Sequence, residues 1–94
     1  MSDDTIRLDK WLWQARFAKT RSLAQALIEG GKARVNGAPC LKPGRAIRPG
    51  DVLTLRLDGG VQVLTVIASG SRRGPATEAA TLYRIHDDPL GGVE

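Results

Sequence analysis

The apolar positions in the first third of the chain recur with the period of an α-helix. A first helix is expected over residues 8–17, with one apolar face formed by Leu8, Trp11, Leu12 and Ala15. A second helix follows a three-residue connection, and its buried stripe is predicted from Leu23, Ala24, Leu27 and Ile28. Because the connection is so short, the second helix must pack back on the first.

The ends of both helices carry polar signals. Asp9 lies near the start of the first helix, where its charge suits the helix dipole. Two N-caps compete for the second helix: Thr20, and Ser22 in a capping box with Gln25. Gln25 and Glu29 are expected to face outwards, and the glycine pair 30–31 ends the helix with a left-handed residue.

The remaining pattern predicts a small β scaffold. Asn-Gly at 36–37 indicates a type I′ hairpin between strands 33–35 and 38–41, and Pro39 makes the second strand an edge or irregular strand. Residues 45–48 form a possible short strand. Alternation of Leu53, Leu55 and Leu57 predicts a strand over 52–57, paired with 61–68 across a glycine turn. A last helix is expected from Ala76 to about Ile85, because Pro75 suits a first turn.

These elements give an α+β fold: two short packed helices against a small antiparallel or mixed sheet, with a short C-terminal helix. With 94 residues the chain forms one compact unit. We divide it into a disordered N-terminus (1–5), a binding domain (6–68) and a C-terminal extension (69–94) that contains a basic loop, the short helix and a loose acidic tail.

Charge is distributed unevenly over this fold. The net charge is +4, but residues 1–50 carry ten Lys or Arg against four Asp or Glu, whereas residues 51–94 carry four against six. A basic half is typical of a protein that binds a polyanion, and it is also compatible with a solvated surface. A single cysteine fits a reducing compartment, so we expect a cytoplasmic protein, and no apolar stretch suits a signal peptide or membrane span.

Residues for catalysis are scarce. His86 lies in an acidic tail and is predicted to be a solvated histidine, and Cys40 is predicted to be a packed thiol. Two potential Cys or His ligands are too few for a typical metal site, and neither glycine-rich phosphate-loop motif occurs. We therefore expect no enzymatic activity, no cofactor, no metal and no small-molecule substrate.

Recognition of RNA is favoured instead. The two helices and the following turn supply cations that match phosphate, namely Arg7, Lys10, Lys19, Arg21, Lys32 and Arg34, with Arg16 as either a contact or a solvated residue. Neutral donors come from Thr20, Ser22, Gln25 and Asn36. Trp13 and Phe17 are candidates for stacking on a base, although at least one is expected to be in the core, and Trp11 is assigned to the core.

Several of these residues form a pattern that resembles a known family. Residues 6–68 resemble the S-four RNA-binding domain, through Arg7-Leu8-Asp9-Lys10, Thr20-Arg21-Ser22, Gly31, Val35-Asn36-Gly37 and Pro49-Gly50-Asp51. Within that superfamily the chain is most similar to the ribosome-associated heat-shock protein fifteen family, through Lys10-Trp11-Leu12-Trp13, Phe17-Ala18-Lys19-Thr20-Arg21 and the later RRGPATEAATLY. Two features differ: this chain ends at Glu94 where the family continues into a long basic helical tail, and Leu23 replaces a Glu that is common in the wider domain.

The resemblance implies binding of structured ribosomal RNA on the large subunit, with a role in stress or ribosome rescue. It implies an RNA surface formed by Arg7, Lys10, Thr20, Arg21, Ser22, Gln25, Lys32, Arg34 and Asn36. We expect a monomer. Two alternatives stay open: an RNA-targeting partner of a separate RNA-modifying enzyme, and a DNA-binding helix-turn-helix, against which the β scaffold argues. A protein–protein adaptor has no specific support from the sequence.

Overall fold

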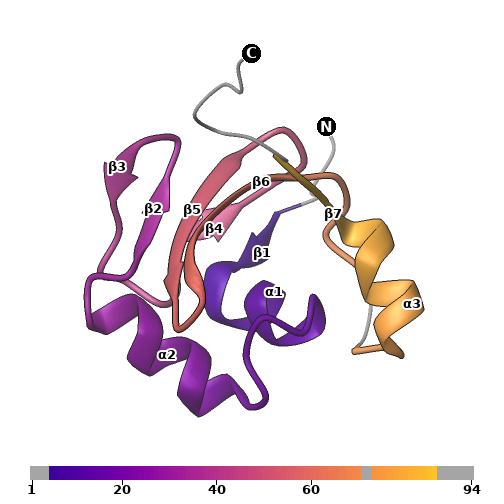
Figure 1. Cartoon of the computed structure of the whole chain (residues 1–94), viewed down its shortest axis with the longest axis horizontal. Coiled ribbons are helices and arrows are strands. Elements are labelled where there is room, and N and C mark those ends of the chain that lie inside the picture. Colours follow the sequence, from indigo (N-terminus) through magenta and orange to yellow (C-terminus); the bar gives the residue numbers. More distant parts are fainter. Residues whose placement is uncertain (1–4, 71–72, 87–94) are drawn as a thin grey trace.

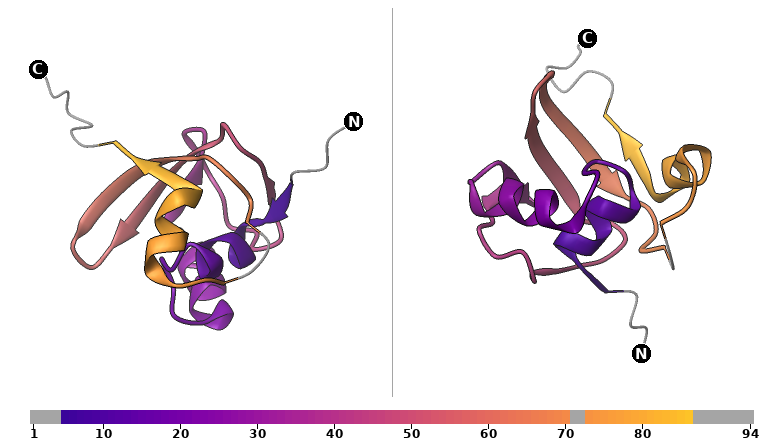
Figure 2. Two further views of the ribbon diagram at one scale, coloured as in Figure 1. Left: turned by 90° about the vertical axis from the view of Figure 1, so that its right-hand side faces the viewer. Right: turned by 90° about the horizontal axis from the view of Figure 1, so that it is seen from below.

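The computed structural model describes residues 5–70 and 73–86, and two helices lie on one face of its main sheet (Figure 1). Predictions for residues 1–4, 71–72 and 87–94, including most of the N-terminus and the acidic tail, fall outside the described residues. Helix α1 spans Leu8–Gln14 and α2 spans Arg21–Glu29. Seen from below, both helices lie in front of the strands (Figure 2, right).

The main sheet is antiparallel and has the strand order β3-β2-β5-β6-β7. Its strands are β2 (Ala33–Val35), β3 (Ala38–Pro39), β5 (Val52–Leu57), β6 (Gly60–Val66) and β7 (Tyr83–Ile85). A separate pair joins β1 (Ile6–Arg7) to β4 (Ala46–Ile47) immediately before α1. The predicted α+β class is confirmed.

The core lies between the helices and the sheet. Its largest fully buried side chains include Trp11, Leu8, Leu12, Ile28, Leu53, Leu55, Leu64 and Val66. Alternation along β5 predicted two of these, because side chains two apart share a face of a strand. Trp11 is confirmed as a core residue, and its indole N–H donates to the Ala68 carbonyl at 2.9 Å.

Helix α1 ends three residues earlier than predicted. Arg16 adopts a φ of +66°, in the left-handed region, so the helical hydrogen-bond pattern stops and the Phe17 N–H returns to the Leu12 carbonyl at 2.9 Å. This tight reversal places Phe17 against Trp11 and Tyr83, with ring centroids 6.0 and 4.7 Å apart respectively. The apolar periodicity marked the helix face correctly, but it could not show where the backbone reverses.

The second helix starts at the first of the two candidate caps. The Thr20 hydroxyl accepts a hydrogen bond from the Leu23 N–H at 3.0 Å, and Gly31 has a φ of +80° at the other end. The prediction that Leu23 is buried is wrong, because 53% of it is exposed. Ala24 and Ile28 form the buried stripe of α2, with Leu27 partly buried beside them.

The β-hairpin follows the prediction closely. Asn36 and Gly37 have φ values of 53° and 86°, both positive as a type I′ turn requires. The strand that contains Pro39 lies at the edge of the sheet, where a missing N–H costs no ladder bond. Cys40 is buried, as expected for a packed thiol.

The predicted helix 76–85 is wrong over its second half. Helix α3 covers only Ala76–Ala79, a 3₁₀ turn (η1) covers Ala80–Leu82, and the chain then extends into β7. Strand β7 pairs with β6, a tertiary partner that a local helical pattern cannot reveal. The same strand brings His86 beside β6, where its Nε2 lies 2.8 Å from the Thr65 hydroxyl, so the prediction of a solvated histidine is also wrong.

Candidate nucleic-acid interface

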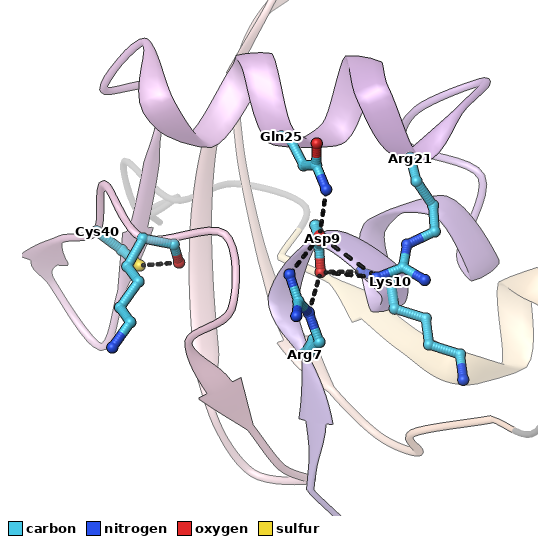
Figure 3. Close-up of polar contacts among 7 residues, drawn as sticks. Arg7, Asp9, Lys10, Arg21, Gln25 and Cys40 are labelled. Carbon is cyan, nitrogen blue, oxygen red and sulfur yellow. Dashed lines mark hydrogen bonds and ion pairs between the residues drawn. The ribbon is translucent and has the colours of Figure 1, made fainter.

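The side chain of Asp9 is fully buried, and Arg7, Arg21 and Gln25 point towards its carboxylate (Figure 3). The start of α1 is held in place by two backbone bonds from the loop before β4. Leu8 N–H donates to the Arg45 carbonyl at 2.8 Å, and Asp9 N–H donates to the Pro43 carbonyl at 3.1 Å. Asp9 therefore has a fixed position between the loop and α2.

Four donors converge on this carboxylate. Arg7 binds it with two nitrogens, Nε to Oδ1 and Nη2 to Oδ2, each at 3.1 Å. The Gln25 side-chain amide donates to Oδ2 at 3.0 Å, and the Lys10 backbone N–H donates to Oδ1 at 2.8 Å. Arg21 approaches from the start of α2, with Nη2 3.4 Å from Oδ2. Gln25 was predicted to face outwards, but its side-chain amide points at Asp9.

These contacts keep Asp9 charged. Burial alone would raise the pKa of Asp9, but hydrogen bonds from Arg7, Gln25 and the Lys10 N–H, together with the positive charge of Arg7, lower that pKa to about 2. The hydrogen bond to Asp9 and the negative charge of Asp9 in turn raise the pKa of Arg7. At neutral pH the carboxylate is therefore a permanent buried anion.

The network orients two arginines without hiding them. The side chains of Arg7 and Arg21 remain 55% and 41% exposed while Asp9 is fully buried. Lys10 is exposed, and its side chain extends beside that of Arg21 and away from Asp9 (Figure 3). Ordered guanidinium groups with free N–H groups suit bidentate recognition of phosphate, because little side-chain freedom is left to lose on binding.

The structure separates the remaining predicted lysines from this surface. Arg21 and Gln25 lie on one side of α2, and Leu23 and Leu27 lie on the other, as the helical spacing of 100° per residue requires. On that second side, Lys19 and Lys32 border a groove of about 680 Å³. Lys19 and Lys32 therefore lie on the opposite side of α2 from Arg21 and Gln25.

Four other predicted RNA-binding residues have bonds within the fold. The Thr20 hydroxyl caps α2, the Arg34 Nη1 donates to the Gly37 carbonyl at 3.3 Å, and the Arg16 Nε donates to the Gly74 carbonyl at 2.8 Å. The fourth is Asn36, whose Oδ1 accepts from the Val52 N–H at 2.9 Å. These bonds give the four side chains structural roles, whereas Ser22 is simply exposed.

The sequence pattern did not predict that Asp9 is the acceptor at the centre of the network, or that Arg73 packs beside Trp13. Asp9 was interpreted only as a partner of the helix dipole, although its position two residues after Arg7 was a usable signal. Arg73 donates from Nε to the Trp13 carbonyl at 2.9 Å and lies 5.7 Å from the centre of the Trp13 ring. Phe17, the other candidate for base stacking, packs against the core.

Within residues 5–70 and 73–86, no three His, Cys, Asp or Glu side chains come together in a way that would hold a metal ion. No helix there is both long and apolar enough to cross a membrane.

Comparison with known proteins identifies the family. The family model of the S4 domain matches residues 6–53. Heat shock protein 15 of Escherichia coli K12 is 49% identical over 78 residues, which cover 83% of this chain and 58% of that protein. The chain thus spans less than two thirds of the length of this relative.

Two other relatives match over most of their own length. The RQC P-site tRNA stabilizing factor of Halalkalibacterium halodurans is 35% identical over 91 residues, covering 95% of this chain and 100% of that protein. The solved structure of Vibrio cholerae Heat Shock Protein 15, described as trimeric, has 41% identity and a TM-score of 0.84, covering 92% of this chain and 86% of that one. The resemblance predicted from the sequence is confirmed: this chain belongs to the S4 domain family and is similar to Heat shock protein 15.

Proposed function

We propose that this chain is a ribosome-associated RNA-binding protein that recognises structured ribosomal RNA on the large subunit and catalyses no reaction itself. The observation that carries the proposal is the convergence of Arg7, Arg21 and Gln25 on the buried Asp9 carboxylate. This arrangement presents two ordered, half-exposed guanidinium groups beside the exposed Lys10. Such a rigid basic surface suits the fixed phosphate geometry of a folded RNA.

The relatives support a ribosome-associated role and suggest its cellular setting. One is named for heat shock and another for stabilizing a P-site tRNA, so we propose a cytoplasmic role in stress or in rescue of ribosomes. Arg7, Lys10, Arg21 and Gln25 come from one chain, so we propose that a monomer binds the RNA. Sedimentation of the free protein tests this point, since one solved relative is described as trimeric.

The decisive variant is Arg21→Ala, tested by filter binding to an RNA hairpin. Loss of this guanidinium should weaken binding by about 1–3 kcal/mol without loss of the fold. Arg84→Ala is the matched control, because Arg84 is exposed on β7, far along the chain from the Asp9 network, and carries the same charge. Equal affinity of Arg21→Ala and the wild type, or an equal loss in both variants, would contradict the assignment.

Salt dependence and competition complete the test. If about five phosphates are neutralised, the logarithm of affinity should fall with the logarithm of salt concentration with a slope of roughly −4. Hairpin RNA should displace the protein from duplex DNA. Salt-sensitive sedimentation with large ribosomal subunits would support the proposed target, and absence from the subunits at low salt would argue against it.

A further inference from the structure

The groove on the second side of α2 differs from the Asp9 surface in both shape and chemistry. It lies between the loop after α1, the outer side of α2, and the turn that joins β5 to β6. Its walls are tied together by the backbone of Lys32, whose N–H donates to the Leu27 carbonyl at 3.1 Å and whose carbonyl accepts from the Arg56 N–H at 2.8 Å. The groove is therefore a fixed feature of the fold.

Most of the side chains that line the groove are apolar, namely Phe17, Ala18, Leu23, Ala26, Leu27 and Leu57. Helical periodicity would place Leu23 in the core, yet 53% of it is exposed. A groove of about 680 Å³ with a largely apolar lining and a few polar groups has the general character of a ligand site.

The rim of the groove is basic. Lys19, Lys32 and Arg56 line it with one acidic residue, Asp58. Each of the three cations is exposed, and none forms an ion pair with another residue of the part of the chain that the structure describes. Unpaired cations beside apolar side chains complement a ligand that has both an apolar ring and negative charge.

We propose that this groove receives one unpaired nucleotide of the bound RNA, with its base against Leu23, Leu27 and Leu57 and its flanking phosphates near Lys19, Lys32 and Arg56. The proposal rests on the proposed function and extends it from helical RNA to a bulged or unpaired base. Proteins read single-stranded RNA by stacking splayed bases on aromatic side chains and placing phosphates against cations, and flipped bases also pack in pockets between aromatic and apolar side chains. The excess of cations over Asp58 favours a nucleotide over an apolar protein segment.

The groove lies close to the Asp9 surface along the chain. Lys19 at its rim is two residues before Arg21, so one RNA can contact both sides around the start of α2. A hairpin that rests on Arg7, Lys10 and Arg21 would then present a neighbouring unpaired base to the groove.

The test uses RNA hairpins that are identical except for one bulged uridine at successive positions, together with the fully paired hairpin. The full chain should bind at least one bulged hairpin roughly 5- to 100-fold more tightly than the paired one, with the gain from one base stacked on an aromatic side chain as the guide. Leu23→Asn should remove most of this gain and change the affinity for the paired hairpin little. Val61→Asn is the matched control, because Val61 is also exposed, at 59%, but does not line the groove.

A second variant and a second readout make the test independent of one substitution. Arg56→Gln should reduce the same gain, and the methyl NMR signals of Leu23, Leu27 and Leu57 should shift with the bulged hairpin and much less with the paired one. The proposal is overturned if no bulge position improves binding by the wild type. It is also overturned if Leu23→Asn and Arg56→Gln keep the full gain, which would place the bulged base elsewhere on the protein. Failure of the paired hairpin to bind would instead contradict the proposed function.

Discussion

Cationic side chains lie on both sides of α2, but in the part of the chain that the structure describes only those on one side are held by an acidic partner. On the Asp9 side, Arg7 and Arg21 are held by a buried carboxylate with a pKa of about 2. On the groove side, Lys19 and Lys32 line the groove next to apolar side chains. One surface is ordered before any ligand arrives, and the other keeps its cations free.

This difference separates two ways of binding a polyanion. Ordered guanidinium groups have already lost side-chain freedom, so a phosphate in the correct place binds strongly and a misplaced one does not. Free lysines attract phosphate over a wider range of positions but contribute less to selectivity. We therefore expect the Asp9 side to set the position of the RNA and the groove side to add affinity for a local feature.

The largest effect should come from Asp9→Asn, which removes the anion that orders one side. The change leaves two guanidinium groups facing a neutral amide, so we expect the free energy of unfolding to fall by about 2–3 kcal/mol. Affinity for hairpin RNA should fall at least tenfold at a temperature where the variant is folded, because Arg7 and Arg21 are no longer oriented. Urea denaturation and filter binding measure the two effects, and retention of both values would show that Asp9 does not order this surface.

The pH dependence of stability gives this prediction a second readout. The pKa of Asp9 lies at about 2 in the folded chain, below its ordinary value of 3.8, so the carboxylate stabilises the fold fully above about pH 4. That contribution is lost as the pH falls from about 4 towards 2, and it amounts to about 2 kcal/mol. The wild type should lose this amount relative to Asp9→Asn over that interval, whereas parallel pH curves would contradict the prediction.

The next largest effect concerns Asn36, which was predicted to contact RNA and belongs to neither side of α2. Asn36→Ala loses the acceptor for the Val52 N–H and places an alanine at a φ of 53°, so it should cost about 1–2 kcal/mol of unfolding free energy. Glycine adopts this φ without strain, so Asn36→Gly loses only the side-chain hydrogen bonds and should lower the unfolding free energy by a smaller amount. Thermal denaturation measures both, and unchanged RNA affinity in the folded variants would assign Asn36 a structural role alone.

The parts of the fold that depend on local chemistry could be predicted from the sequence. The Asn-Gly turn and the glycine pair at the end of α2 follow from the needs of a few neighbouring residues, and Thr20 was one of two candidate caps between which the sequence did not decide. Strand β5 also followed, because alternation along a strand reports burial on one face. The basic residues of the interface were recognised by type, since phosphate recognition favours Arg and Lys.

The failures all depend on tertiary contacts. Leu23 fits the apolar period of α2 but lies outside the buried stripe, in a groove that it shares with the loop after α1 and the β5–β6 turn. Residues 83–85 become a strand because β6 offers an unpaired edge. Which cations approach Asp9 and which line the groove depends on how α2 is oriented relative to Asp9. The residue pattern of the sequence does not give that orientation.

The smallest expected effect compares the two sides directly through Lys10→Gln and Lys19→Gln. Each variant removes one exposed charge, so each should reduce the log–log salt slope by about one unit if its lysine neutralises a phosphate. With a fully paired hairpin, Lys10→Gln should show this reduction and Lys19→Gln should show little. With the bulged hairpin that binds most tightly, both should show it, because the unpaired nucleotide then places phosphate at the groove. Filter binding over a range of salt concentrations measures all four slopes. Equal reductions with the paired hairpin would mean that the two sides of α2 act as one continuous electrostatic surface.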